Sequence, residues 1–234
     1  MKRKWLALLI CATPAAAQPL YFTGAIAGNV QGNDGSTIAG ALLSLQLQPP
    51  YVRSRHPQIE WVTTSASDGS FQFAGLDGGV YRLCGYLPHG IWLNPCVWGL
   101  QPPTATLSRA QPSATITLTL NKGAVVPIRI NDPSQFLSQY EGGSPGSDLL
   151  IGVVGDSRIF VPAQLVSQDS GGRNQQVAIP FGPSVNLLIY GPQFQLSSGG
   201  LPLPIASTTT IPVTVPSGQQ APTVTLQVTG RSVP

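Results

Sequence analysis

Apolar and polar residues alternate along much of the chain with a period of two. The first half shows this most clearly at 24–30, where Ile26, Gly28 and Val30 share one face, and at 41–48, where leucines alternate with Ser and Gln. A period of two places successive side chains on opposite faces of a β-strand. Together with the turn residues between them, such runs predict strands at 24–30, 41–48, 59–65, 71–74, 80–86, 104–107 and 114–120. Seven short strands separated by turns are typical of a β-sandwich.

The second half also has strand character, although its pattern is less regular. Its candidate strands are 124–130, 149–154, 160–166, 176–179, 185–190, 209–215 and 224–228. A helical turn or two is expected only at 134–140, and no internal repeat relates the two halves. We predict a domain boundary at the short connection 121–123. Residues 18–121 then form one β-domain, and residues 122–234 form a second β-rich domain of unknown type.

The first seventeen residues have the composition of a secretory signal peptide. Lys2, Arg3 and Lys4 precede the apolar run 5–12, and three alanines follow before Gln18. This run is far shorter than the roughly 20 apolar residues of a membrane-spanning helix. We therefore expect an exported protein that does not insert into the membrane and that is periplasmic, on the cell surface or extracellular. Lipid attachment at Cys11 is disfavoured because a large residue, Ile10, precedes it.

Charge excludes several kinds of partner. The chain has twelve Lys and Arg against nine Asp and Glu, and three of the twelve lie in the signal, so the remainder has nine of each. Nucleic-acid binding requires clustered cations that neutralise phosphates. Here the arginines are scattered and Lys122 is the one lysine after the signal. We expect no nucleic-acid partner, no polybasic membrane patch and no acidic calcium cage.

Two cysteines, Cys84 and Cys96, remain after the signal. In an oxidising compartment such a pair is expected to form a disulfide, which for so short a loop is worth about 3 kcal/mol. The bond would staple 87–103, a Pro- and Trp-rich stretch without clear period that we predict to be a long loop. A metal site that adds His89 would lack a fourth ligand. We expect no metal and no cofactor.

The run 67–83, Ser-Asp-Gly-Ser-Phe-Gln-Phe-Ala-Gly-Leu-Asp-Gly-Gly-Val-Tyr-Arg-Leu, closely resembles the central signature of carboxypeptidase regulatory-like domains. The resemblance covers about 24–120. It implies a transthyretin-like, prealbumin-type sandwich, a fold grouped with carbohydrate-binding sandwiches, and an accessory role beside peptidases, outer-membrane receptors or surface proteins. Neither a peptidase nor a barrel is recognisable in this chain. The second half resembles companion regions of bacterial secreted proteins of this type, which brings no function with it.

The residues that carry this resemblance have structural rather than catalytic roles. Glycines and aspartates suit tight turns, and alternating aromatic residues suit a core. Asp34 and Asp77, like the aspartate of the signature, are expected to cap backbone donors at turns, with a single weak calcium ion between two such loops as the alternative. The turn and core residues of the signature are Asp68, Gly69, Phe71, Phe73, Gly75, Gly79 and Tyr81.

Two serines lie in patterns that resemble hydrolase motifs. Ser144 lies in a Gly-x-Ser-x-Gly pattern, but no helix-forming sequence follows it. Ser157 lies in Gly-Asp-Ser, but Arg158 stands where the corresponding esterase family has leucine, and no histidine follows His89. A serine nucleophile requires a base beside it. We therefore predict a flexible loop around Ser144, a hairpin turn at Ser157, and no enzymatic activity, with His56 and His89 at the surface.

The most suggestive cluster is aromatic and consists of Tyr86, Trp92 and Trp98 around the predicted disulfide loop. Flat rings cover sheet edges, anchor protein interfaces or stack on sugars. We expect an all-β chain in which a transthyretin-like (Ig-like) sandwich is followed by a second sandwich-like domain. It would act as a non-enzymatic structural or interaction protein of the bacterial envelope, with an unknown protein or glycan partner. The alternative is a carbohydrate-binding module, in which Trp92 or Trp98 would be exposed and coplanar with a second ring.

Overall fold

The computed structural model describes residues 23–49, 59–88, 90–138, 149–204 and 208–232. Every regular element in these ranges is a β-strand, which confirms the all-β prediction. Among the same residues there is no helix long and apolar enough to cross a membrane. The predicted signal peptide, Cys11, His56, His89 and Ser144 lie outside the described residues.

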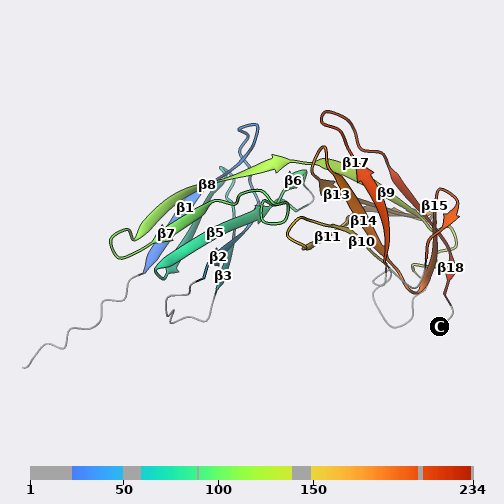
Figure 1. Cartoon of the computed structure of the whole chain (residues 1–234), viewed down its shortest axis with the longest axis horizontal. Coiled ribbons are helices and arrows are strands. Elements are labelled where there is room, and N and C mark those ends of the chain that lie inside the picture. Colours follow the sequence, from blue (N-terminus) through green and yellow to red (C-terminus); the bar gives the residue numbers. More distant parts are fainter. Residues whose placement is uncertain (1–22, 50–58, 89, 139–148, 205–207, 233–234) are drawn as a thin grey trace, which may run out of the picture.

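The first eight strands form two facing sheets in the left half of Figure 1. One sheet has the order β4-β1-β8-β6 and the other β3-β2-β5-β7. Strands β1 and β8 are parallel, whereas the remaining neighbours are antiparallel. The strands are β1 (Gly24–Gly32), β2 (Leu42–Leu47), β3 (Glu60–Thr64), β4 (Ser70–Leu76), β5 (Gly79–Tyr86), β6 (Trp92–Leu93), β7 (Thr104–Leu107) and β8 (Ser113–Lys122).

Alternating side chains of these strands fill a core between the two sheets. Phe71 and Phe73 are buried and meet edge to face, with ring centroids 5.9 Å apart. Tyr81 is fully buried, packs edge to face against Trp61 at 5.6 Å, and donates its hydroxyl hydrogen to the Asp77 carbonyl at 2.8 Å. The polar tip of this large side chain is therefore satisfied inside the core, as a buried hydroxyl requires.

The last ten strands form a second pair of sheets with their own core. The orders are β12-β13-β9-β18-β15-β16 and β11-β10-β14-β17. The core between them is mostly aliphatic, with Phe194 as a large buried aromatic side chain. The strands are β9 (Ala124–Asn131), β10 (Leu150–Val154), β11 (Phe160–Pro162), β12 (Gln164–Asp169), β13 (Gly172–Ile179), β14 (Ser184–Tyr190), β15 (Phe194–Ser198), β16 (Leu201–Pro202), β17 (Thr209–Thr214) and β18 (Val224–Arg231).

Three predictions for the second half differ from the structure. The single strand expected at 160–166 is two strands on different sheets, because the chain passes from β11 to β12 at Ala163, directly after a proline that cannot donate to a ladder. Strands β15 and β16 were not expected. In the described part of 134–140, Gln135 and Ser138 donate to carbonyls three residues earlier in successive turns, and no regular helix is formed there.

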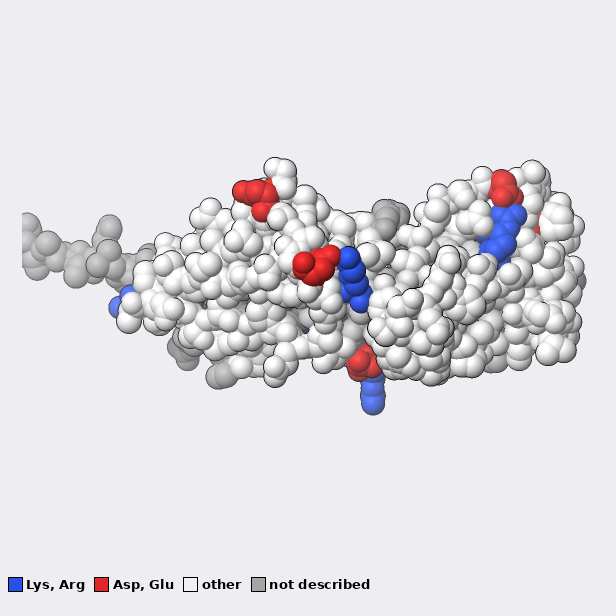
Figure 2. Space-filling view, turned by 90° about the horizontal axis from the view of Figure 1, so that it is seen from above, with Lys and Arg blue, Asp and Glu red and all other residues white. Residues whose placement is uncertain are grey.

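The two sandwiches lie end to end and are joined where β8 leads into β9 (Figure 1). The expected connection at 121–123 is shorter in the structure, because only Gly123 lies outside the two strands. A Cβ at this glycine would lie 2.6 Å from the Leu93 side chain and 2.7 Å from the Ile179 carbonyl. Figure 2 shows that charged side chains are few and separated on the face seen from above. On this face, the surface of both sandwiches is therefore largely uncharged.

Candidate functional site

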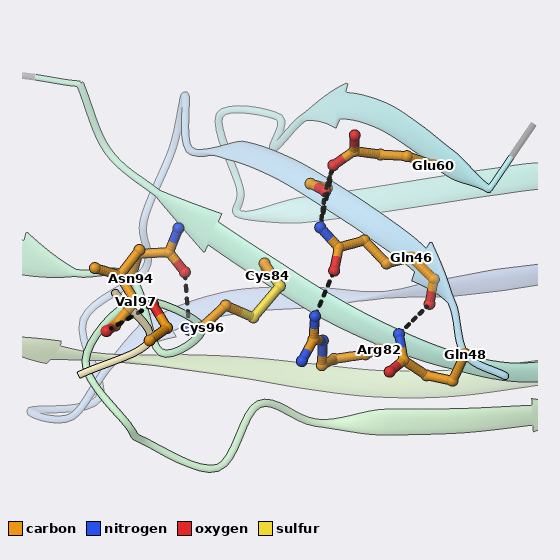
Figure 3. The surroundings of a disulfide bond; sticks show 10 residues. Gln46, Gln48, Glu60, Arg82, Cys84, Asn94, Cys96 and Val97 are labelled. Carbon is orange, nitrogen blue, oxygen red and sulfur yellow. Dashed lines mark hydrogen bonds between the residues drawn. A yellow bond between two sulfur atoms is a disulfide. The ribbon is translucent and has the colours of Figure 1, made fainter. Parts of the chain in front are cut away.

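The predicted disulfide between Cys84 and Cys96 is present, with a Cα–Cα distance of 5.6 Å (Figure 3). Leu83 and Gly85, on either side of Cys84, face the core of the first sandwich. The Cys84 side chain therefore lies on the opposite, outer face of β5. The loop that follows β5 therefore folds back over this outer face. Asn94 supports the turn, since its side-chain oxygen accepts the Cys96 amide at 3.0 Å.

Polar side chains continue along the same outer face, across three strands (Figure 3). Arg82 donates to the Gln46 amide oxygen at 2.7 Å, and Gln46 donates to Glu60 at 3.2 Å. Ser44 also donates to Glu60. These hydrogen bonds, first that from Ser44 and then that from Gln46, lower the pKa of Glu60. These hydrogen bonds link the outer faces of β5, β2 and β3.

The disulfide loop contributes to both cores, because Leu87 and Trp92 pack against the first core and β6 pairs with β8. Leu93, Val97 and Trp98 are 4%, 6% and 6% exposed, and they pack among the aliphatic side chains of the second sandwich. We expected residues 87–103 to be a stapled loop within 18–121. In the structure β6 adds to the sheet of the first sandwich, whereas Leu93, Val97 and Trp98 fill part of the second core before the chain returns as β7. The apolar residues of the loop show no regular period. They pack against side chains of other strands and do not form one face of a strand or helix of their own.

The hairpin turn between β10 and β11 receives this loop. Both the amide and the hydroxyl of Ser157 donate to the Val97 carbonyl, each at 3.1 Å. A Cβ at Gly155 would lie 2.5 Å from the same carbonyl, so only glycine permits this approach. The structure thus places Ser157 in the expected hairpin turn, where its hydroxyl holds two segments together.

A half-enclosed pocket of about 300 Å³ lies where the two sandwiches and the disulfide loop meet. Its floor is buried and includes Leu93, Val97, Trp98 and Val177, whereas Tyr86, Ile159 and Phe160 are 41%, 50% and 38% exposed at its mouth. We call this cavity the junction pocket. Its walls come from β5, the disulfide loop, the β10–β11 hairpin, β9 and β13. No signal in the sequence indicated that Ile159 and Phe160 would face residues 86–98.

The structure brings Tyr86, Trp92 and Trp98 together around the junction pocket. Trp98 is only 6% exposed, which fits a ring that covers a core and does not fit the exposed ring that the carbohydrate-binding alternative would place at Trp98. Trp92 is half-buried. Its ring lies over Gly32, where a Cβ would come within 2.3 Å, and the Lys122 ammonium is 5.3 Å from its centroid.

Lys122 also forms an ion pair with Asp34 at 2.7 Å. The Lys122 ammonium, together with the hydroxyl and amide of Ser36, holds the pKa of Asp34 well below its usual range. Asp34 caps its turn, since the Ser36 amide donates to it at 3.0 Å. Asp68 likewise accepts the Ser70 amide at 3.0 Å. Among the described residues, no group of three or more His, Cys, Asp or Glu side chains could hold a metal ion.

Different structural features favour glycine at each glycine position of the sequence signature. Gly69 and Gly75 adopt positive φ angles of 76° and 71°, which disfavour other residues. Gly79 does not, but a Cβ there would lie 2.5 Å from the Leu47 side chain. None of these positions lines the junction pocket.

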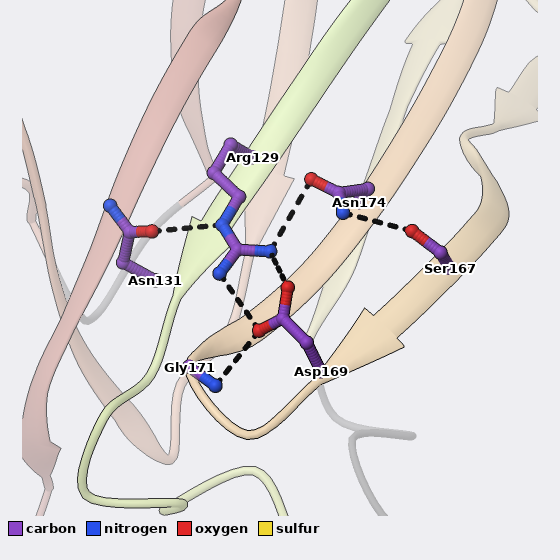
Figure 4. Close-up of polar contacts among 6 residues, drawn as sticks. All are labelled: Arg129, Asn131, Ser167, Asp169, Gly171 and Asn174. Atoms are coloured by element: carbon purple, nitrogen blue, oxygen red, sulfur yellow. Dashed lines mark hydrogen bonds and ion pairs between the residues drawn. The ribbon is translucent and has the colours of Figure 1, made fainter.

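A second polar cluster lies on the second sandwich (Figure 4). Arg129 donates to both carboxylate oxygens of Asp169, at 2.7 and 3.0 Å, and to Asn131 at 2.9 Å. The Arg129 hydrogen bonds, followed by the Gly171 amide, lower the pKa of Asp169. The cluster joins β9 to the end of the β12–β13 hairpin, so it stabilises the sheet rather than forming a separate site.

Comparisons with known proteins report likeness in fold. No protein-family model and no curated protein matches the chain. Among solved structures, a streptococcal ancillary pilin is 12% identical with a TM-score of 0.42, over 88% of this chain and 62% of that one. A shaft pilin of Lactobacillus rhamnosus GG is 10% identical with a TM-score of 0.33, over 89% of this chain and 99% of that one.

The dioxygenase domain of a fusion protein from Streptomyces sp. SirexAA-E is 14% identical with a TM-score of 0.28, over 46% of this chain and 84% of that one. At such identities the likeness bears on fold alone. The chain spans 62% of the length of the streptococcal pilin. The carboxypeptidase regulatory-like assignment is not confirmed by these comparisons.

Proposed function

We propose that the chain is a non-enzymatic, exported structural or interaction protein of the bacterial envelope. In this proposal residues 18–121 form an accessory sandwich of the carboxypeptidase regulatory-like type, and residues 122–234 form a second β-domain. The protein would reside in the periplasm, on the cell surface or outside the cell. Its partner would be a protein that contacts both sandwiches.

The observation that carries this proposal is the double connection between the sandwiches. One connection is the passage from β8 to β9, and the other is the disulfide loop, which is bonded to β5 through Cys84 and buried in the second core through Val97 and Trp98. Two separate connections restrict hinge motion. A protein whose two halves keep a fixed orientation loses less entropy when a partner contacts both.

The polar groups at the junction favour a structural role over catalysis. The Ser157 hydroxyl donates to a backbone carbonyl, and the Asn94 side chain accepts a backbone amide. Both interactions stabilise the loop. A nucleophile would instead require a neighbouring base that accepts its proton.

Affinity capture from envelope fractions tests the proposal, with the oxidised protein as bait and the reduced protein as the matched control. We expect a protein partner that crosslinks to both sandwiches of the oxidised bait and is retained at least tenfold less by the reduced bait. Crosslinks confined to one sandwich would contradict the proposed role of the junction. Turnover of an ester, peptide or glycoside that Ser157→Ala abolishes would show an enzyme instead.

One observation favours the carbohydrate-binding alternative, namely that the Tyr86 ring is 41% exposed at the pocket mouth beside the half-buried Trp92. Aromatic rings at the edge of a groove stack on sugar faces. A glycan array separates the two functions. Saturable binding of a glycan that Tyr86→Ala abolishes would establish the alternative, whereas no binding would leave the structural role.

A further inference from the structure

We propose that the junction pocket is a binding site for a small, uncharged and largely apolar ring compound. This inference goes beyond a structural role and does not depend on it. It follows from the depth of the pocket, the chemistry of its lining and the rigidity of its walls.

The exposure of the lining residues shows that the cavity has depth. Side chains at the mouth, such as Ile159 at 50%, are accessible, whereas Leu93 and Val177 at the floor are each 4% exposed. The volume of about 300 Å³ lies at the lower end of the range for small-molecule sites, which is roughly 300–1,000 Å³. A ligand of two or three rings fits this size, and such sites occur preferentially at interfaces between domains.

The lining determines the class of ligand. None of the described residues that line the pocket carries a charge, and most are aliphatic or aromatic. A charged ligand would lose its hydration here without gaining an opposite charge, which is costly. The polar side chains in the lining include Asn94, Gln164 and Gln176, which are neutral amides and so offer no charge to a ligand.

A sugar fits this lining less well than an apolar ring does. Sugars present hydroxyl groups around their whole rim, and each buried hydroxyl requires a partner. Here the floor is formed largely by aliphatic side chains and the buried Trp98. An apolar compound would gain free energy from the surface that it buries against them.

The aromatic walls are held in place before any ligand arrives. A Cβ at Gly152 would lie 2.6 Å from the Phe160 ring, and one at Gly32 would lie 2.3 Å from the Trp92 ring, so each ring rests directly on a glycine backbone. The disulfide holds the segment that carries Trp98 against β5. Rings fixed in this way lose little freedom on binding.

Fluorescence titration with N-phenyl-1-naphthylamine, a neutral three-ring probe, tests the site on the purified protein. We expect saturable binding of one probe per chain with quenching of tryptophan emission, because Trp92 and Trp98 line the pocket. Ala178→Phe places a ring inside the pocket and should weaken binding about tenfold or more, since it removes the space that the probe needs. Ala27→Phe is the matched control, because Ala27 is also a half-buried strand alanine but lies outside the pocket.

The outcomes are decisive in both directions. Loss of binding in Ala178→Phe but not in Ala27→Phe supports the site, and if Ala178→Phe does not fold, Trp92→Ala should weaken binding instead. Absence of saturable binding, or equal affinity in all variants, would overturn the proposal. Displacement of the probe by millimolar glucose or N-acetylglucosamine would overturn the apolar ligand class. Failure here leaves the proposed structural role untouched, because that role is tested by capture of a protein partner.

Discussion

Breaking the disulfide should lower the unfolding free energy of the protein. It should also allow the two sandwiches to unfold separately. Cys84 and Cys96 are separated by 12 positions in the sequence. In the chain-entropy model, opening a loop of this length costs about 3 kcal/mol of unfolding free energy. With a urea dependence of about 2 kcal/mol per molar, the unfolding midpoint should fall by about 1.5 M on reduction.

Tryptophan fluorescence can report each half separately. Trp61 packs on Tyr81 in the first core, and Trp98 is buried in the second. In variants that keep one of these tryptophans, the shift of each urea transition on reduction is measured within the same variant. After reduction the loop that carries Trp98 is no longer tied to β5, so the two transitions should separate.

The reasoning would be refuted if the reduced and oxidised proteins unfolded at the same urea concentration. It would also be refuted if reduction moved only the Trp61 transition, since the loop would then not bridge the two cores. The double variant Cys84→Ala/Cys96→Ala is the control. Reductant should leave its transitions unchanged.

Three further predictions test the packing. Gly155→Ala would bring a Cβ within 2.5 Å of the Val97 carbonyl and should lower the unfolding free energy by about 1–3 kcal/mol; an unchanged urea midpoint would contradict the close approach. Burial raises the pKa of Tyr81 to about 12, so the unfolded chain ionises first and stability should fall as pH rises from about 10 to 12; absorbance at alkaline pH should show one late-titrating tyrosine that Tyr81→Phe removes. Trp98→Ala should cost about 3–5 kcal/mol in calorimetry and Tyr86→Ala less than about 1, because only Trp98 is buried; equal losses would contradict this.

The candidate site could be predicted only in part. Cys84 and Cys96 could be paired from the sequence, because the expected export leaves two cysteines after the signal with few alternatives to a disulfide. The aromatic residues near them were recognised as a cluster that could cover a core or a sheet edge, but the sequence did not indicate that Trp98 packs into the second core. Burial depends on what covers a ring, and the residues that cover this one belong to a distant part of the chain.

Local chemistry in the sequence determined where most strands and turns lie. Alternation of side chains and the turn residues between them act within a few positions, so the strands of the first half could be read directly. Only the tertiary structure decided which sheet each strand joins, as the division of 160–166 between β11 and β12 shows. It also decided that Leu93, Val97 and Trp98 of the disulfide loop are buried in the second core, because their burial depends on strands that are distant in the sequence.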